Sequence, residues 1–176
     1  MPSFTNAPAQ ADEQLMALRA LKARYPYMFV RPHIGQDFYR GWLADFIVAC
    51  NAIDELLGAD KRGFHFRQLK EKYGWARYYW ATDQVTPLRL SLIANGGVLE
   101  RQYGLDSADR VDQQICQILL AAEKSSMQKC IVCSEHAESR SFGGWRVLTC
   151  DRHGPDAMER DALFHAAHLR DAEESI

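Results

Sequence analysis

The chain has 176 residues, 47% of them hydrophobic and 25% charged, which are ordinary values for a folded protein. Its 23 acidic and 21 basic residues give a formal net charge of −2, which excludes a protein that coats nucleic acid or an anionic membrane by bulk charge. The longest apolar runs have five residues, whereas a membrane-spanning helix needs about 20. The N-terminus has neither a cationic start nor an apolar stretch, so we expect no secretion signal and a cytoplasmic location.

The first third of the chain predicts two amphipathic helices. Leucines at three-residue steps predict a helix over residues 12–24, which Pro26 ends. Apolar residues at three- and four-residue steps predict a second helix over residues 41–57, and Gly58 suits its C-terminal cap.

The middle of the chain changes to the two-residue period of strands. Alternation over residues 64–67 and 75–80, with a turn near Gly74, predicts an antiparallel hairpin. Residues 87–102 are apolar but interrupted by Gly96 and Gly97, and they predict either a kinked helix or two short pieces.

The last third predicts two more helices around a cysteine-rich segment. The first runs over residues 108–125, with Asp106 or Ser107 as its N-cap. The second begins at Pro155 and runs to about residue 171. Together the elements predict an α+β fold in which helices pack on a small antiparallel hairpin, followed by a zinc-ribbon-like knuckle and a final helix. The expected division is a helical and hairpin domain over 1–126, a metal module over 127–154, and a helix with an acidic tail over 155–176.

Three of the five cysteines form a pattern typical of zinc sites. Cys130 and Cys133 make a C-x2-C pair, and after sixteen intervening residues Cys150 and His153 make a C-x2-H pair. A two-residue gap lets a tight turn present two ligands to one ion, and a hairpin around Gly143 and Gly144 would span the longer gap. The sequence therefore predicts one zinc ion per chain, held by these four residues.

Two alternatives to this assignment stay open. His136 lies just after the C-x2-C pair and competes with His153 as the fourth ligand, and the plainer interpretation is three reduced thiols beside an unrelated histidine. Cys50 and Cys116 stand alone in apolar helical patterns, so we expect them to pack as small hydrophobic side chains.

The sequence favours a structural zinc over a catalytic one. A catalytic zinc keeps one coordination position open and needs a carboxylate base beside it, whereas four protein ligands fill the tetrahedron here. Zinc deaminases carry a proline before the C-x2-C pair, and Lys129 occupies that position. We find no pattern that assigns catalytic residues, so the prediction is a non-enzymatic protein.

The predicted hairpin is basic and rich in aromatic residues. Between Asp60 and Trp80 there are six basic and two acidic residues together with seven aromatic ones. Cations interleaved with rings are typical of surfaces that bind single-stranded nucleic acid. The candidate residues are Lys70, Lys72, Trp75, Arg77 and Tyr79. The plainer interpretation is that the rings pack on the helices while the charges face water.

The order of these motifs resembles a group of small uncharacterised phage and prophage proteins. The matching stretches are Tyr25-Pro26 with Phe29, Gly41-Trp42 with Cys50, KEKYGWARYY at 70–79, and CIVC with GGWRVLTCDRH at 143–153. Ser134 stands where that group usually has glycine, Ala76 where it usually has leucine, and the last 20 or so residues extend past the usual end. The resemblance supports the zinc site and implies a phage or mobile-element origin in a bacterial host, but it implies no activity.

These observations lead to three hypotheses about function. The first is a phage-type accessory protein that docks on a host protein or complex, for instance as an inhibitor of a nucleic-acid-processing or defence complex, as an anti-CRISPR is. The second is direct nucleic-acid binding through the basic aromatic hairpin. The third is a hydrolase or nuclease whose site the sequence does not reveal.

Overall fold

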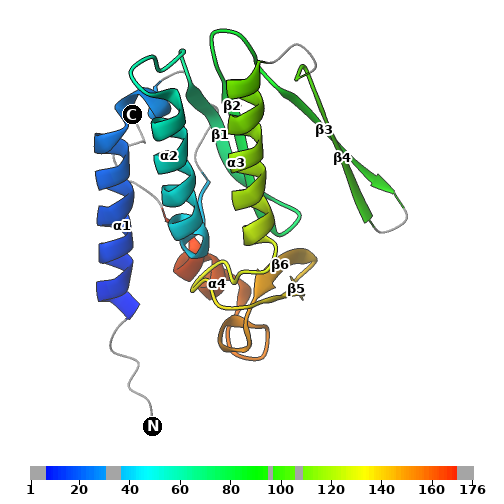
Figure 1. Cartoon of the computed structure of the whole chain (residues 1–176). Coiled ribbons are helices and arrows are strands. Elements are labelled where there is room, and N and C mark those ends of the chain that lie inside the picture. The colour runs from blue at the N-terminus through cyan, green and yellow to red at the C-terminus, as the bar shows by residue number, and fades with distance from the viewer. Residues whose placement is uncertain (1–6, 31–36, 95–96, 106–108, 170–176) are drawn as a thin grey trace.

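The computed structural model describes residues 7–30, 37–94, 97–105 and 109–169 (Figure 1). The described chain combines helices and antiparallel strands, so the predicted α+β class is confirmed. The helices are α1 (Ala7–Arg24), α2 (Leu43–Leu57), α3 (Arg110–Ser126) and α4 (Arg160–Ala167), with short 3-10 turns η1 (Pro26–Phe29), η2 (Arg40–Trp42) and η3 (Asp151–His153). The strands are β1 (His65–Lys72), β2 (Trp75–Ala81), β3 (Leu88–Ala94), β4 (Gly97–Tyr103), β5 (Glu138–Phe142) and β6 (Trp145–Thr149).

The strands pair as three separate antiparallel hairpins within the described residues, β1–β2, β3–β4 and β5–β6. A bulge between Phe66 and Gln68 shifts the register of β1 against β2, so that Phe66 faces Trp80 and Leu69 faces Tyr78. Phe66 and Leu69 are three residues apart, so in a regular strand they would point to opposite faces. The bulge places both on the same face of the hairpin. An isolated two-stranded hairpin is only marginally stable in water, so each of the three needs a cover.

Helices α1, α2 and α3 form one layer in front of the β1–β2 hairpin (Figure 1). In Figure 1, α1, α2 and α3 stand side by side, with α3 antiparallel to α2, and β1 and β2 lie behind them. Rings fill the contact: the Phe46 centroid lies 5.2 Å from that of Phe66 and 5.2 Å from that of Tyr78. Trp42, at the start of α2, is fully buried in the same core.

Side chains of α3 also cover the open edge of β2. The Tyr78 N–H donates to Glu123 Oε1 at 2.8 Å, and the Ala76 N–H donates to Ser126 Oγ at 2.9 Å. Arg89 at the start of β3 donates to both oxygens of Glu123 at 2.8 Å, and both side chains are 5% exposed. Glu123 therefore connects α3, β2 and β3. With Ser126 it also supplies acceptors for the backbone N–H groups of Tyr78 and Ala76 at the edge of β2.

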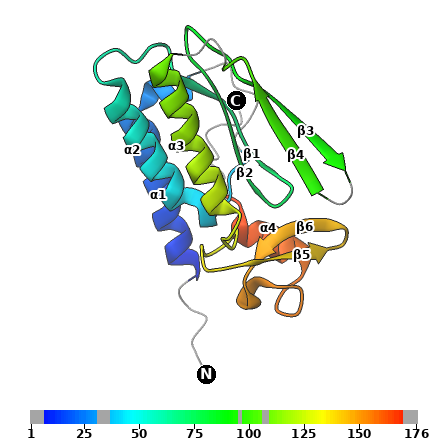
Figure 2. The same ribbon diagram turned by 45° about the vertical axis from the view of Figure 1, so that its right-hand side comes forward.

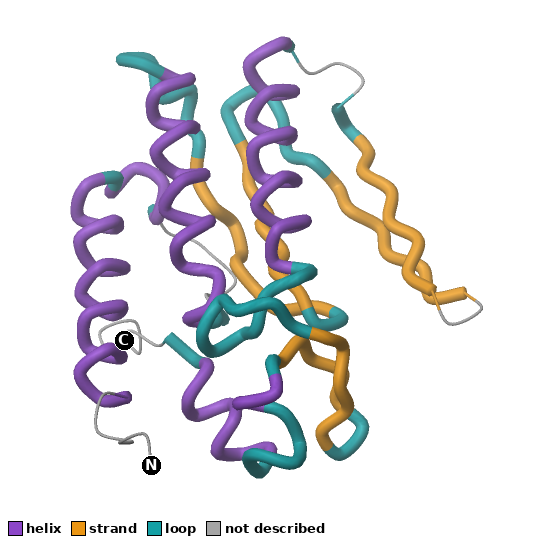
Figure 3. The backbone as a smooth tube through the Cα atoms, turned by 60° about the horizontal axis from the view of Figure 1, so that its bottom comes forward, coloured by secondary structure: helices purple, strands orange, loops and turns teal. Residues whose placement is uncertain are grey.

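The C-terminal segment packs on the same core as the helices. Figure 3 shows β5, β6 and α4 gathered at one end of the α2–α3 layer. Cys130, Ile131, Val147 and Leu163 belong to the same buried cluster as Trp42. The predicted division of the chain after residues 126 and 154 stays a prediction. Residues from all three predicted segments belong to one hydrophobic core. Residues 170–176, with three of the six acidic residues of the predicted segment 155–176, lie outside the described residues.

The helical alternative for residues 87–102 is wrong, because this segment forms the β3–β4 hairpin. Leu88, Leu90 and Leu92 alternate with Arg89 and Ser91, which is the two-residue period of a strand. The helical prediction for residues 87–102 rested on their number of apolar residues, whereas the spacing of these residues indicates a strand. Figures 1 and 2 both show this hairpin diverging from α3.

Three predicted helix starts need correction. The N-cap of α3 is Asp109, whose side chain accepts from the Asp112 N–H, and the candidates Asp106 and Ser107 lie outside the described residues. Pro155 does not open the last helix, which begins only at Arg160 after a turn closed by hydrogen bonds to the Gly154 carbonyl. Helix α1 begins at Ala7, five residues before its expected start at Asp12.

We predict that Glu123→Ala lowers the free energy of unfolding by about 3–5 kcal/mol, because it leaves Arg89 buried without its carboxylate and removes the acceptor of Tyr78. Glu123→Gln retains an acceptor and is expected to cost less. Urea denaturation measures both, with the exposed neighbour Lys124→Ala as the control. Equal stability of Glu123→Ala and Lys124→Ala would contradict the role given to Glu123.

Candidate metal centre

Three cysteines and one histidine lie together at the junction of two turns. Their ligand atoms all fall within 4.8 Å of one another, and the residues are Cys130, Cys133, Cys150 and His153. The first pair follows α3, and the second pair begins directly after β6 and continues into η3. The structure thus brings together the four residues that the sequence spacing predicted.

The first turn is closed by its own backbone. The Ser134 N–H donates to the Cys130 carbonyl at 3.1 Å, and the Cys130 N–H donates to the Glu135 carbonyl at 2.8 Å. Ser134 has a φ of +64°, a left-handed conformation in which a Cβ is unfavourable. Its hydroxyl donates to the Gly41 carbonyl at 2.6 Å, which holds the residue in place.

The second turn places its ligands against the first. The His153 N–H donates to the Cys150 carbonyl at 3.0 Å, which folds the histidine back over the cysteine. The Ile131 N–H donates to the Leu148 carbonyl at 3.0 Å, which joins the first turn to β6. Two pairs that are far apart in sequence therefore reach the same point because β6 delivers the second pair beside the first.

Gly41 fixes the first turn to the helical layer. Its N–H donates to the Ile131 carbonyl at 2.8 Å, and a Cβ at this position would lie 1.9 Å from the Cys130 carbonyl oxygen. Only glycine allows so close an approach of two backbones. Lys129 adds an ion pair with Asp45 of α2 at 2.7 Å. Sequence reasoning missed the role of Gly41 beside the metal ligands, although the glycine stands in one of the stretches that carry the resemblance.

The distances between the ligand atoms fit a tetrahedral ion. Cys133 Sγ lies 3.6 Å from Cys150 Sγ, and His153 Nδ1 lies 3.4 Å from Cys130 Sγ and 3.3 Å from Cys150 Sγ. Metal–sulfur bonds of about 2.3 Å and metal–nitrogen bonds of about 2.0 Å at tetrahedral angles separate two sulfurs by about 3.8 Å and a sulfur from a nitrogen by about 3.5 Å. The four side chains therefore form a site compatible with a single bound metal ion.

The surroundings of the Cys130 sulfur favour its thiolate form. Hydrogen bonding from the Cys133 thiol lowers the pKa of Cys130 to about 4, helped by the backbone N–H groups of Cys150, Val132 and Cys133 and opposed by burial. The same hydrogen bond raises the pKa of Cys133. Arg152 Nη2 lies 3.9 Å from Cys133 Sγ, and the negative charge of Cys133 and Cys150 raises the pKa of this arginine. The site thus contains donors and a cation suited to a deprotonated sulfur.

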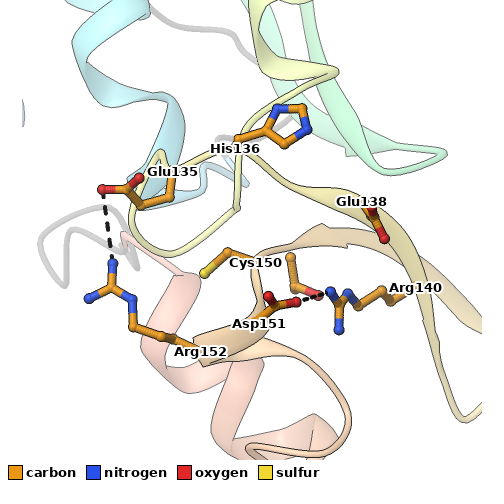
Figure 4. Close-up of a pocket in the computed structure, with 8 residues that line it drawn as sticks. Glu135, His136, Glu138, Arg140, Cys150, Asp151 and Arg152 are labelled. Carbon is orange, nitrogen blue, oxygen red and sulfur yellow. Dashed lines mark hydrogen bonds and ion pairs between the residues drawn. The ribbon is translucent and has the colours of Figure 1, made fainter.

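A shallow hollow of about 320 Å³ opens beside Cys150, and four of its lining residues form two ion pairs (Figure 4). Arg152 reaches Glu135 at 4.0 Å, and Arg140 pairs with Asp151. The lining residues are Glu135, His136, Glu138, Arg140, Thr149, Cys150, Asp151 and Arg152. His136 is exposed and lies outside the group of four ligands, so among the described residues the histidine in the group is His153.

The two isolated cysteines lie in the core as predicted. Cys50 is 0% and Cys116 6% exposed, and burial raises the pKa of both thiols. They therefore pack as small hydrophobic side chains, Cys50 in α2 and Cys116 in α3, and neither belongs to the group of four candidate metal ligands.

The candidate nucleic-acid-binding residues share one face of the β1–β2 hairpin. The register places Lys70 opposite Arg77 and Lys72 opposite Trp75, and Tyr79 continues the same face. Lys70 Nζ lies 4.6 Å from the Tyr79 ring centroid. Arg77 is only 1% exposed and its guanidinium lies 4.5 Å from the Trp75 ring centroid, so it is not available at the surface. The other four candidates are half-buried, and a binding role for this face stays a prediction.

Comparisons with family models, with curated proteins and with solved structures found no match. None of the described helices has the length and apolar composition to cross a membrane.

Proposed function

We propose that Cys130, Cys133, Cys150 and His153 bind one Zn²⁺ ion that holds the C-terminal segment in shape. The distances between the ligand atoms support zinc, because they match those expected for zinc–thiolate and zinc–imidazole bonds. Thiolate and imidazole donors in a tetrahedron are also the set that structural zinc prefers. A zinc ion with three thiolates and a neutral imidazole carries a net charge of −1, which the nearby guanidinium of Arg152 offsets.

We predict one zinc ion per purified chain by elemental analysis. Cys133→Ser is expected to lose the metal and to lower the free energy of unfolding by on the order of 3 kcal/mol or more, because the two turns would no longer be joined. His136→Ala is the matched control and is expected to retain both metal and stability. Metal-free wild-type protein that is fully folded would contradict the proposal, as would loss of zinc in His136→Ala.

We infer that the protein as a whole is a non-enzymatic accessory protein that docks on a protein partner. The observation that carries this proposal is a row of large apolar side chains left in solvent on the β3–β4 hairpin: Leu88, Leu90, Leu92, Leu99 and Tyr103 are 58%, 48%, 61%, 65% and 40% exposed. Contiguous exposed apolar side chains on a folded protein mark interaction sites. The four protein ligands also leave the proposed zinc without an open position for substrate.

The resemblance to phage and prophage proteins supports a bacterial host protein or complex as the partner. A nucleic-acid-processing or defence complex, inhibited in the manner of an anti-CRISPR, is the proposed class.

Immobilised protein is expected to retain a specific host protein from a bacterial lysate after nuclease treatment. Retention is expected because apolar contacts, unlike contacts through phosphate, do not depend on nucleic acid. The Cys133→Ser variant serves as the misfolded control for non-specific capture. Recovery of proteins only when nucleic acid is intact would contradict protein docking and favour the alternative below.

An alternative function is direct binding of single-stranded nucleic acid through the outer face of the β1–β2 hairpin. The observation that favours it is the alignment of Lys70, Lys72, Trp75 and Tyr79 on one face, with the cations lying over rings. Rings stack bases and cations bind phosphates on such surfaces.

If this alternative holds, affinity for a short fluorescent single strand falls steeply with salt. Lys72→Ala would then reduce the slope of log K against log salt by about 0.7, because one phosphate contact is lost. Fluorescence anisotropy measures this, with Lys124→Ala on the exposed side of α3 as the control. Absence of salt-sensitive binding at low ionic strength would remove the alternative.

A further inference from the structure

The β3–β4 hairpin has two unlike faces. The register pairs Leu88 with Tyr103, Leu90 with Arg101 and Leu92 with Leu99, so these six side chains lie on one face. On the other face Arg89 is 5% exposed and bound to Glu123 of α3. The ion pair therefore fixes the root of the hairpin to the body and turns the leucine face into solvent.

The β1–β2 hairpin shows how an apolar hairpin face is covered in this molecule. The apolar face of β1–β2 is covered by helices, with Phe46 of α2 packed against Phe66 and Tyr78. A two-stranded hairpin gains stability when its apolar face packs against a helix. No described helix covers the leucine face of β3–β4, since all five of its large apolar side chains are at least 40% exposed.

The dimensions of the leucine face fit one helix. Seven-residue strands are about 24 Å long and a two-stranded ribbon is about 10 Å wide. A helix of about 16 residues has the same length and width. The ribbon plane offers on the order of 240 Å², whereas a standard interface between two globular chains buries about 800 Å² on each side.

The charge of the face indicates what that helix carries. Arg101 is exposed at the centre, opposite Leu90, and its guanidinium lies 5.7 Å from the Tyr103 ring centroid. None of the six residues of the face is acidic, and among the described residues no ion pair involves Arg101. A second copy would place two such arginines in the same layer without a carboxylate, which disfavours self-association.

We propose that the leucine face of β3–β4 binds an amphipathic helix of a protein partner, with an apolar stripe on the leucines and a carboxylate against Arg101. This proposal rests on the protein-docking function above and names its surface and the chemistry of its partner.

Two 16-residue helical peptides with the same leucine stripe test the proposal by fluorescence anisotropy. One carries glutamate at the central position beside the stripe and the other carries lysine there. Wild-type protein is expected to bind the glutamate peptide at least about ten-fold more tightly, and Arg101→Glu is expected to reverse this preference. Leu92→Thr with Leu99→Thr is expected to weaken both peptides at least about ten-fold. Threonine retains the preference for a strand, and circular dichroism checks the fold of each variant.

Val48→Thr is the matched control, because Val48 is 66% exposed on α2, away from the hairpin. It is expected to bind both peptides as the wild type does. Equal binding of the two peptides, or binding of neither, would overturn the proposal. A wild-type dimer in sedimentation that Leu92→Thr with Leu99→Thr converts to a monomer would overturn it too, and would assign the face to a second copy.

The lysate experiment separates failure of this proposal from failure of protein docking. If Leu92→Thr with Leu99→Thr still retains the nuclease-resistant partner, docking stands and the leucine face is the wrong surface. If wild-type protein retains no such partner, docking itself fails, and the preference between the two peptides still decides what the leucine face binds.

Discussion

The backbone contact between Gly41 and the Cys130–Cys133 turn is the constraint on which the arrangement of the C-terminal segment depends. Hydrogen bonds run from the Gly41 N–H to the Ile131 carbonyl and from the Ser134 hydroxyl to the Gly41 carbonyl. They fix a turn that carries two of the four ligands to the start of α2. Because the same turn also bonds to β6, the second ligand pair is delivered to the same point. A metal ion at that point would lock together elements that backbone packing has already aligned.

The three two-stranded hairpins differ in how their apolar faces are covered. Helices cover β1–β2, whereas the Cys130–Cys133 turn bonds to β6 and Phe164 of α4 packs on Trp145 of β6. The third, β3–β4, is joined to the body through Arg89, which binds the Glu123 carboxylate that also completes the hydrogen bonding of β2 and which lies over the Tyr79 ring. The hairpin least covered by the described chain is therefore the one proposed to bind a partner, whereas the proposed zinc ion would hold the C-terminal segment in shape.

Much of the fold follows from patterns that are local in sequence. The spacing of apolar residues places α2, and the alternation around Gly74 places β1 and β2. The leucines of β3 have the same two-residue period, but Gly96 and Gly97 and the many apolar residues of the segment are also compatible with a kinked helix. The bulge at Phe66 and Gln68 has no sequence signal of this kind, since it depends on which face the helices cover.

The sequence by itself indicated the three cysteines of the candidate site, because the chemistry of a tetrahedral site restricts which residues and which spacings can supply it, and the structure then placed His153 rather than His136 beside them. The sequence also determined the buried role of Cys50 and Cys116. Only the tertiary structure decided that Arg77 is buried under Trp75 while Leu90 is exposed. Burial depends on what distant segments cover, and an arginine on a strand or a leucine on a hairpin contains no information about the element that packs above it.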